Sequence, residues 1–252
     1  MKFLKQSLNK ESHLGPHTIV LIPAYNEGKR IGRVIEEIKR ILPRIDVLII
    51  DDGSADESRQ RAMEAGAKVI SHPFNLGYGS ALQTGYKYAL KEGYETIVQM
   101  DGDGQHDPSF ISDLLAVVQR DEADIAIGSR FLKNEKRESY GPSYRVPFTR
   151  RVGMRLFGSI TSFLIRQQVT DSTSGYQAMD RRVLEWVSGD KFPVDYPDAD
   201  VIIMLHRAGF RIKEVPVRMA ESQGKKSMHS GWKPLYYVFK MFLSILVTLM
   251  RK

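Results

Sequence analysis

Thr96–Asp107 reads TIVQMDGDGQHD, an apolar strand that runs directly into a turn containing three carboxylates. Asp101 and Asp103 are two residues apart, so in an extended chain both side chains point to the same side. Gly102 and Gly104 let the backbone approach a ligand without a side-chain clash. Oxygen ligands of this kind suit Mg²⁺ or Mn²⁺, which usually keep coordination positions for water and substrate phosphates.

The same turn also has a purely structural interpretation. Asp107 precedes Pro108, which is the pattern of a helix N-cap followed by proline at the first helical position. Capping does not need Asp101, Asp103 or Gln105. We therefore expect both features, a helix that begins at Pro108 and a cation site just before it.

The chain around this turn alternates apolar strands with amphipathic helices. The predicted strands are Thr18–Ile22, Asp46–Ile50, Ala67–Ser71, Thr96–Met100 and Asp124–Gly128. This rhythm is typical of an α/β protein with a doubly wound, mostly parallel sheet and helices on both faces. Ligands of such sheets bind beyond the carboxyl ends of the strands. The unusual polar clusters lie at those ends, at Tyr25–Glu27, Asp51–Asp52, Asp101–Gln105 and Ser129–Arg130.

The pattern changes after Arg130. A polar, basic loop is expected first, and then a helix over Pro147–Arg166. Thr170–Tyr176 is a run of hydroxyls and one carboxylate that is too dense for an ordinary linker. A helix over Ala199–Ala208 and a strand over Phe210–Val217 follow, and we predict that this strand pairs antiparallel.

No known nucleotide-binding loop follows the first strand. Neither GxGxxG nor GxxxxGK[ST] occurs there, so a dinucleotide fingerprint and a P-loop are both excluded. A nucleotide would have to be held in another way. Asp51 or Asp52 is placed to accept hydrogen bonds from a base or a ribose, although Asp52 also fits as a turn residue before Gly53.

Composition fits one large α/β domain. The chain has 252 residues, of which 42% are hydrophobic, and it has no cysteine. Disulfides and thiol nucleophiles are therefore excluded, which fits a reducing compartment. Residues 1–17 have neither the pattern of a signal peptide nor that of a membrane span, so we expect a protein on the cytosolic side.

The net charge of +7 is concentrated in two segments. Ser129–Arg166 carries nine Lys or Arg against two Glu, and Ala220–Lys252 carries six against one. The rest of the chain is therefore net acidic. Such segregation indicates basic surfaces that meet phosphates, nucleic acid or anionic lipid. The alternative is a charged face that only contacts solvent.

Trp232–Lys252 is expected to form an amphipathic helix, because a membrane span needs ~20 apolar residues. Lys233, Lys240, Ser244 and Thr248 form one stripe at helical spacing. The opposite side carries Leu235, Val238, Phe239, Phe242, Ile245, Leu246 and Leu249. Such a helix covers the sheet, dimerises, or lies in a membrane interface beside anionic headgroups. We favour the interface.

Six motifs occur in a fixed order: IPAYNE at 22–27, DDGS at 51–54, NLG at 75–77, DGDGQ at 101–105, GSR at 128–130 and EVPV at 214–217. In this order the chain resembles family 2 glycosyltransferases, in particular those that transfer a sugar to a polyprenyl phosphate. The resemblance covers Thr18–Arg218. It departs from the family pattern at Tyr78, where many relatives carry a basic residue, and in having no convincing transmembrane helices after the catalytic domain.

The resemblance implies a GT-A fold and inverting transfer from a UDP- or GDP-sugar to a polyprenyl phosphate such as dolichyl or undecaprenyl phosphate. The nucleotide-sugar pocket would include Pro23, Ala24, Tyr25, Glu27, Asp52, Gly77, Asp101 and Gly102. Mg²⁺ or Mn²⁺ would be held by Asp101, Asp103 and Gln105. The acceptor and its phosphate would meet Arg130, Ser174, Arg218, Lys225 and Lys226.

The need for a general base depends on the acceptor. A lipid phosphate is already ionised, whereas a sugar hydroxyl needs a base, for which Asp198, Asp200 and Asp171 are the candidates. Transfer to a glycan hydroxyl is therefore the alternative within enzymes. A non-catalytic nucleotide- or nucleic-acid-binding protein is the alternative of another class. The acidic turn would repel a nucleic-acid backbone, so we expect no nucleic-acid partner.

These inferences divide the chain into three parts. Residues 1–17 are an N-terminal extension, 18–218 the catalytic domain, and 219–252 a basic loop followed by the amphipathic, membrane-associated helix. We expect a peripheral protein on the cytoplasmic face of a membrane. A homo-oligomer remains open, since the last helix also suits a dimer contact.

Overall fold

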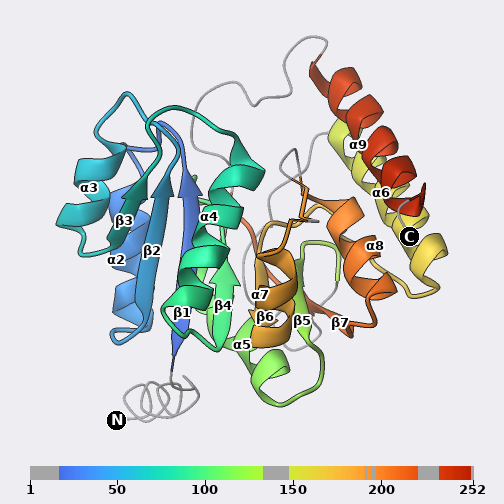
Figure 1. Cartoon of the computed structure of the whole chain (residues 1–252), viewed down its shortest axis with the longest axis horizontal. Helices are drawn as coiled ribbons and strands as arrows, with labels where there is room; N and C mark the ends of the chain where they lie inside the picture. Colours follow the sequence, from blue (N-terminus) through green and yellow to red (C-terminus); the bar gives the residue numbers. More distant parts are fainter. Residues whose placement is uncertain (1–16, 133–147, 191, 194–196, 221–232, 251–252) are drawn as a thin grey trace.

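Seven strands form one sheet in the computed structural model, which describes residues 17–132, 148–190, 192–193, 197–220 and 233–250. The strands are β1 (Thr18–Ala24), β2 (Asp46–Asp51), β3 (Lys68–Ser71), β4 (Thr96–Gln99), β5 (Ile125–Ser129), β6 (Gln177–Asp180) and β7 (Ile212–Pro216). Their order across the sheet is β3-β2-β1-β4-β6-β5-β7 (Figure 1). The helices are α2 (Ile31–Ile41), α3 (Ser58–Glu64), α4 (Tyr78–Lys91), the 3₁₀ turn η1 (Pro108–Phe110), α5 (Ile111–Gln119), α6 (Phe148–Ile165), α7 (Arg181–Val187), α8 (Ala199–Arg207) and α9 (Lys233–Met250).

The five strands predicted before Arg130 are all present. β1 lies between β2 and β4 and pairs parallel with both. All seven of its residues are buried. Successive residues of β1 point to opposite faces, so Ile19 and Leu21 enter one core while Val20 and Ile22 enter the other. β1 is therefore buried on both faces of the sheet.

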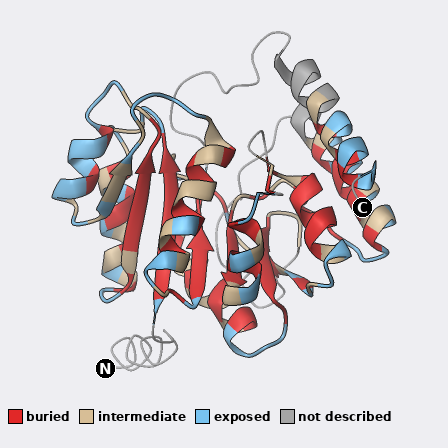
Figure 2. Cartoon of the chain, viewed as in Figure 1, coloured by how far each residue is buried: buried red, intermediate tan, exposed pale blue. Residues whose placement is uncertain are grey.

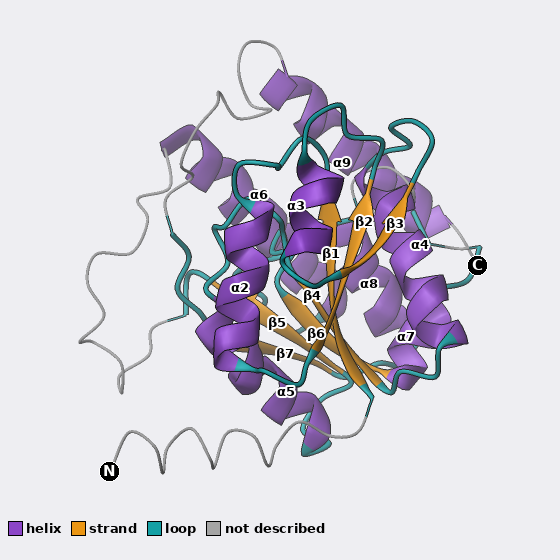
Figure 3. Ribbon diagram, turned by 90° about the vertical axis from the view of Figure 1, so that its left-hand side faces the viewer, coloured by secondary structure: helices purple, strands orange, loops and turns teal. Residues whose placement is uncertain are grey.

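Helices cover both faces of the sheet. α2, α3 and α5 contribute to the core on one face, and α4, α7 and α8 to the core on the other. Figure 3 shows the strands between α2 and α5 on one side and α4 and α7 on the other. Figure 2 shows the central strands buried along their length. The prediction of a doubly wound, mostly parallel α/β sheet is confirmed.

The prediction for the last strand was wrong in direction. β7 pairs parallel with β5, with Ile212 opposite Ile125. The antiparallel strand is β6, which pairs with β4 and β5 and directly follows the polar run 170–176. The sequence analysis predicted neither β6 nor α7. Both are short, and β6 mixes polar with apolar residues that are nevertheless buried.

Helix α9 packs with Ser244 and Thr248 toward the protein. Thr248 is 5% exposed, whereas Leu246 is 54% exposed. Ile245, which the sequence placed on the apolar side, is buried beside the core. Figure 1 shows α9 lying along α6, and the Ser244 hydroxyl of α9 donates to Asp200 of α8. Among the described residues, no helix combines the length and the hydropathy that crossing a membrane requires.

Candidate active site

The acidic turn begins where β4 ends at the carboxyl edge of the sheet. The Gln105 N–H donates to Asp103 Oδ1 at 2.9 Å, which closes the turn over Gly104 with its φ of 77°. Burial raises the pKa of Asp103 above its usual value, and the negative charge of Asp101 raises it further. Asp107 caps η1 by accepting from the Ser109 N–H at 2.9 Å, as the sequence predicted.

Tyr78 and His106 flank the Asp101 carboxylate. The Tyr78 hydroxyl donates to Oδ1 at 3.0 Å. His106 Nδ1 accepts from the Asp101 N–H at 3.0 Å, so in the neutral ring the proton sits on Nε2, which lies 3.7 Å from Oδ2. The His106 ring stacks on Tyr176 with centroids 4.8 Å apart. The sequence analysis gave His106 no role, because its partner Tyr176 is distant in the chain.

Asp198 lies close enough to Tyr78 to change the pKa of its hydroxyl. Burial raises the pKa of Tyr78 well above its ordinary value, and the negative charges of Asp101 and Asp198 raise it further. The hydroxyl is therefore a neutral hydrogen-bond donor at physiological pH. Asp198, which directly precedes α8, thus lies within electrostatic reach of the Tyr78 hydroxyl.

The chain that leaves β7 crosses the acidic turn. The Ala220 N–H donates to the Gln105 carbonyl at 2.8 Å, and Gln105 Nε2 donates to the Ala220 carbonyl at 3.4 Å. Arg218 is exposed two residues earlier. The turn and the start of the basic segment are thus joined, while Lys225 and Lys226 lie outside the described residues.

Asp52 organises the start of α4. Its carboxylate accepts from the Leu76 and Gly77 N–H groups, each at 2.9 Å, and from His72 Nδ1 at 2.7 Å. His72 Nε2 lies 2.9 Å from the Thr84 hydroxyl. The sequence analysis missed His72, although its place just after β3, at the carboxyl edge, was a usable signal. Asp52 therefore orders Gly77, and a direct contact with a base or ribose stays a prediction.

The loop after β1 brings Glu27 near the acidic turn. The Asn26 backbone is left-handed with φ of 56°, and the Glu27 N–H donates to the Ser58 hydroxyl at 2.7 Å. Burial raises the pKa of Glu27, the hydrogen bond from Arg30 opposes this, and Asp103 raises it again. Glu27 thus lies within electrostatic reach of the acidic turn. Tyr25 is 50% exposed, which leaves its ring free to contact a ligand.

Three further predicted residues lie in β1 or against it. Pro23 and Ala24 are the last, buried residues of β1. Gly102 lies against the same strand, since a Cβ there would be 3.3 Å from Ile22. A side chain at position 102 would therefore press against Ile22 and Ile31, and close approach of a ligand at this glycine stays a prediction.

Arg130 is held by a buried carboxylate. Its Nε and one terminal nitrogen each lie 2.6 Å from an oxygen of Asp171, and the same terminal nitrogen lies 3.2 Å from the Thr173 hydroxyl. The Asp171 side chain has no exposed surface. This two-point ion pair makes Asp171 a poor general base, and it ties Arg130 to the polar run. Ser174 is buried in that run, and its hydroxyl accepts from the Tyr176 N–H at 3.3 Å.

Asp200 points away from this site toward α9. Its Oδ1 accepts from the N–H groups of Asp198 at 3.0 Å and Val201 at 2.9 Å, and its Oδ2 accepts from the Ser244 hydroxyl. Burial raises its pKa, although these hydrogen bonds oppose the shift. The residue is fully buried, so the geometry favours Asp198 over Asp200 as the group that faces a substrate.

Asp101 and Asp103 suit a divalent cation that a substrate helps to bind. Within the described ranges, no three His, Cys, Asp or Glu side chains are grouped closely enough to form a metal site by themselves. Mg²⁺ is ordinarily bound by one or two carboxylates together with substrate phosphates. The Asp101 side chain is 36% exposed, and the repulsion that raises the pKa of Asp103 would be relieved by a cation. The residues present therefore fit Mg²⁺ or Mn²⁺.

Comparisons with known proteins identify the family. The family model of glycosyl transferase family 2 matches residues 19–187. The polyprenol monophosphomannose synthase of Mycolicibacterium smegmatis is 31% identical over 234 residues, which cover 89% of this chain and 85% of that protein. The UDP-N-acetylglucosamine–dolichyl-phosphate N-acetylglucosaminyltransferase of Methanococcus voltae is 30% identical over 251 residues, or 92% of this chain and 96% of that protein.

Solved structures share the fold. Glucosyl-3-phosphoglycerate synthase from Mycobacterium tuberculosis, in complex with Mn²⁺, uridine diphosphate and glucosyl-3-phosphoglycerate, superposes with a TM-score of 0.69 at 20% identity. The match covers 97% of this chain and 82% of that one. Fold and site thus define a glycosyltransferase of the GT-A fold. The chain belongs to glycosyl transferase family 2, and the resemblance inferred from the six motifs is confirmed.

Proposed function

We propose that the protein transfers a sugar from a nucleoside-diphosphate sugar to a polyprenyl phosphate, with inversion at the anomeric carbon. The observation that carries this proposal is the pair Asp101 and Asp103 at the carboxyl end of β4, where Asp101 accepts from the Tyr78 hydroxyl and Asp103 acts electrostatically on Glu27. Relatives that match most of the chain are named for polyprenol and dolichyl-phosphate acceptors. UDP and GDP both remain open as the donor nucleotide, and so does the sugar.

The chemistry is a single displacement. An oxygen of the acceptor phosphate forms a bond to the anomeric carbon while the bond from that carbon to the donor diphosphate breaks, and the nucleoside diphosphate leaves with the electron pair. Attack from the side opposite the leaving group inverts the configuration. A bound Mg²⁺ or Mn²⁺ would stabilise the negative charge that develops on the diphosphate.

Most of the predicted site residues would have a task in this reaction. Asp101, Asp103 and Gln105 would hold the cation. Tyr25 and Glu27 would contact the nucleotide, and Asp52 would act through Gly77, whose N–H it accepts at 2.9 Å. The phosphate-binding set is Arg130, Ser174, Arg218, Lys225 and Lys226. The ion pair with Asp171 limits how Arg130 would bind a phosphate, because it fixes the direction of the remaining N–H donors of the guanidinium.

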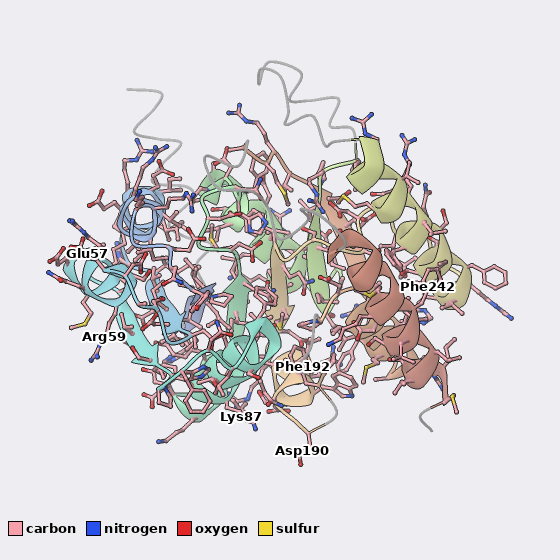
Figure 4. All side chains as sticks on the ribbon, turned by 90° about the horizontal axis from the view of Figure 1, so that it is seen from above. Glu57, Arg59, Lys87, Asp190, Phe192 and Phe242 are labelled. Carbon is pink, nitrogen blue, oxygen red and sulfur yellow. The ribbon has the colours of Figure 1, made fainter. Side chains whose placement is uncertain are left out.

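We also assign the protein to the cytoplasmic face of a membrane as a peripheral enzyme. Exposed apolar side chains gather on α6 and α9, a surface that we term the α6–α9 face, comprising Val152, Leu156, Phe163, Phe242, Leu243, Leu246, Val247, Leu249 and Met250. Phe242, labelled in Figure 4, bridges the two helices with its ring centroid 5.5 Å from that of Phe157. The same helices belong to the two basic segments of the sequence, as a surface beside anionic lipid requires.

A hydroxyl acceptor is the second candidate, and one observation favours it. Asp198 lies close enough to Tyr78 to raise the pKa of that hydroxyl, so a carboxylate is present that would serve as a general base. A polyprenyl phosphate needs no such base. Asp171 and Asp200 are less suited to the role because each is buried and hydrogen-bonded elsewhere.

The test is a donor panel offered to both acceptor classes. Radiolabelled UDP- and GDP-sugars are incubated with protein, Mn²⁺ and either undecaprenyl or dolichyl phosphate or a mixture of soluble glycans. We expect one donor to give a labelled product that extracts into organic solvent. Label that moves only to the soluble glycans would refute the polyprenyl-phosphate proposal and direct attention to Asp198.

A further inference from the structure

We propose that Tyr78 is a positioning residue that fixes the Asp101 carboxylate for the donor-bound cation, and that Gln99 and Tyr86 orient Tyr78 from behind. The inference rests on the proposed function, because it concerns the same cation site. It adds a chain of three side chains from α4 and β4 to which neither the six motifs nor the comparisons give a role.

The hydrogen bonds donate in one direction, from Tyr86 to Gln99, from Gln99 to Tyr78 and from Tyr78 to Asp101. The Tyr86 hydroxyl donates to Gln99 Oε1, which leaves the Gln99 amide nitrogen facing Tyr78. That nitrogen donates to the Tyr78 hydroxyl oxygen at 3.2 Å. A tyrosine hydroxyl has one proton, and the Tyr78 proton therefore points to Asp101 Oδ1 at 3.0 Å.

The reverse direction is disfavoured by the chemistry of the groups at the two ends. An ionised Asp101 only accepts hydrogen bonds, so the Tyr78 proton must point toward it for this contact to be favourable. If the Gln99 amide were turned over, its oxygen would face the Tyr78 oxygen. The single Tyr78 proton would then have two acceptors to serve, and one of them would be left unpaired.

The hydrogen-bonded side chains are buried at a place where apolar side chains would otherwise pack. Gln99 is 3% exposed and Tyr86 2%, and the residues beside Gln99 on β4 are apolar. A buried polar side chain needs a hydrogen-bond partner at each end. Tyr86 and Tyr78 supply these partners from α4, about two helical turns apart. Packing alone gives no reason for an amide at position 99.

Gly175 shows that the space beside the Tyr78–Asp101 pair is filled. A Cβ at position 175 would lie 2.9 Å from the Tyr78 hydroxyl oxygen and 3.2 Å from Asp101 Oδ1. The polar run 170–176 therefore reaches the pair with a residue that has no side chain. Because Tyr78 is neutral, it holds the carboxylate in place while leaving its full negative charge for a cation.

The test compares Mn²⁺ binding in Tyr78→Phe and in Tyr88→Phe, a matched control that removes a hydroxyl from the same helix. Free Mn²⁺ is measured by electron paramagnetic resonance, with whichever of UDP and GDP the wild-type protein binds. We expect Tyr78→Phe to weaken Mn²⁺ binding by ~10-fold, the scale found when groups that orient metal ligands are removed. Tyr88→Phe should bind as wild type does.

Two further measurements separate positioning from general damage. Metal-free binding of the nucleotide should be nearly unchanged in Tyr78→Phe, whereas general damage to the site would weaken it as well. A lower melting temperature is expected, because the buried Gln99 amide loses its partner. Tyr86→Phe keeps the Tyr78 hydroxyl but removes the group that orients Gln99, so we expect weaker Mn²⁺ binding by a smaller factor. An unchanged dissociation constant in Tyr86→Phe would remove Gln99 and Tyr86 from the proposal.

The outcomes distinguish this inference from the function on which it rests. Wild-type affinity for Mn²⁺ in Tyr78→Phe, with the wild-type protein binding normally, would overturn the positioning role and leave the proposed function standing. A wild-type protein that bound nucleotide but took up no Mn²⁺ would overturn the metal site itself, and this inference with it.

Discussion

Asp200 shows how one buried carboxylate connects the last helix with the start of α8. It accepts two backbone N–H groups at the beginning of α8 and the Ser244 hydroxyl from α9. One of these N–H groups belongs to Asp198, at 3.0 Å from the Asp200 carboxylate. The negative charge of Asp198 in turn raises the pKa of Tyr78. The position of Asp198 in the site therefore depends on a contact with α9.

We predict that Asp200→Asn preserves transfer and that its effect on stability depends on pH. Burial raises the pKa of Asp200, so the charged carboxylate costs stability above that pKa and the wild-type protein gains stability as pH falls through it. Asparagine can accept the two N–H groups and donate to Ser244 without carrying charge. The advantage of Asp200→Asn in urea unfolding should therefore be largest near neutral pH and shrink on acidification.

Asp200→Ala is the contrasting variant. It leaves two backbone donors and one hydroxyl without their partner, which costs about 1–3 kcal/mol for each buried group that stays unsatisfied. We expect lower stability at every pH. Loss of transfer in a folded Asp200→Asn protein would contradict a structural role and restore this residue as a candidate base.

Residues of the site could be predicted from the sequence where side chains of suitable chemistry lie close together in the chain. Asp101, Asp103 and Gln105 are close in sequence and share one turn, so their grouping followed from the chain alone. The partners of Arg130 and Asp52 did not, because Asp171 is 41 residues away from the one and His72 is 20 from the other. Such pairs depend on the order of strands, which periodicity does not reveal.

At the level of elements, α9 presents its apolar side outward and its Ser244–Thr248 stripe inward. The sequence predicted the amphipathic helix, but a helical pattern alone does not say which side meets the protein. Here two hydrogen bonds to α8 show which side of α9 faces the protein. Arg207 donates to the Thr248 carbonyl at 2.8 Å, and Ser244 donates to Asp200. β6 and α7 were missed because short elements carry little periodicity.

We predict that Leu246→Glu lowers binding to anionic vesicles. Leu246 is 54% exposed on the α6–α9 face, so a charge there should disturb docking without disturbing the core. Met63→Glu is a matched control, because Met63 is also 54% exposed but lies on α3 at the other end of the molecule. Sedimentation with vesicles that contain phosphatidylglycerol measures the difference.

Two results would contradict the membrane assignment. If Leu246→Glu pelleted with the vesicles as well as Met63→Glu did, the α6–α9 face would not be the docking surface. If Leu246→Glu instead changed a dimer into a monomer in size-exclusion chromatography without affecting vesicle binding, the face would be a contact between copies of this chain.

At the scale of the whole molecule, folding brings together features that the sequence separates. The basic segments Ser129–Arg166 and Ala220–Lys252 supply α6 and α9, which lie side by side, and the second segment also starts beside the acidic turn. The helices that carry the exposed apolar face thus belong to the two segments with the basic surplus, and the second of these segments begins beside the cation site. This arrangement suits an acceptor with an anionic head and a long apolar tail.

The most direct test of the central claim is transfer to a matched pair of acceptors, a polyprenyl phosphate and the polyprenol of the same chain length. Mass spectrometry of the organic phase identifies the product for wild-type protein and for Asp103→Asn, with Mn²⁺ present. We predict a sugar phospholipid from the phosphate only, no product from the polyprenol, and a loss of at least ~100-fold in rate for a folded Asp103→Asn, because one of two carboxylates at the cation site is gone. Glycosylated polyprenol, or an undiminished rate in Asp103→Asn, would contradict the account.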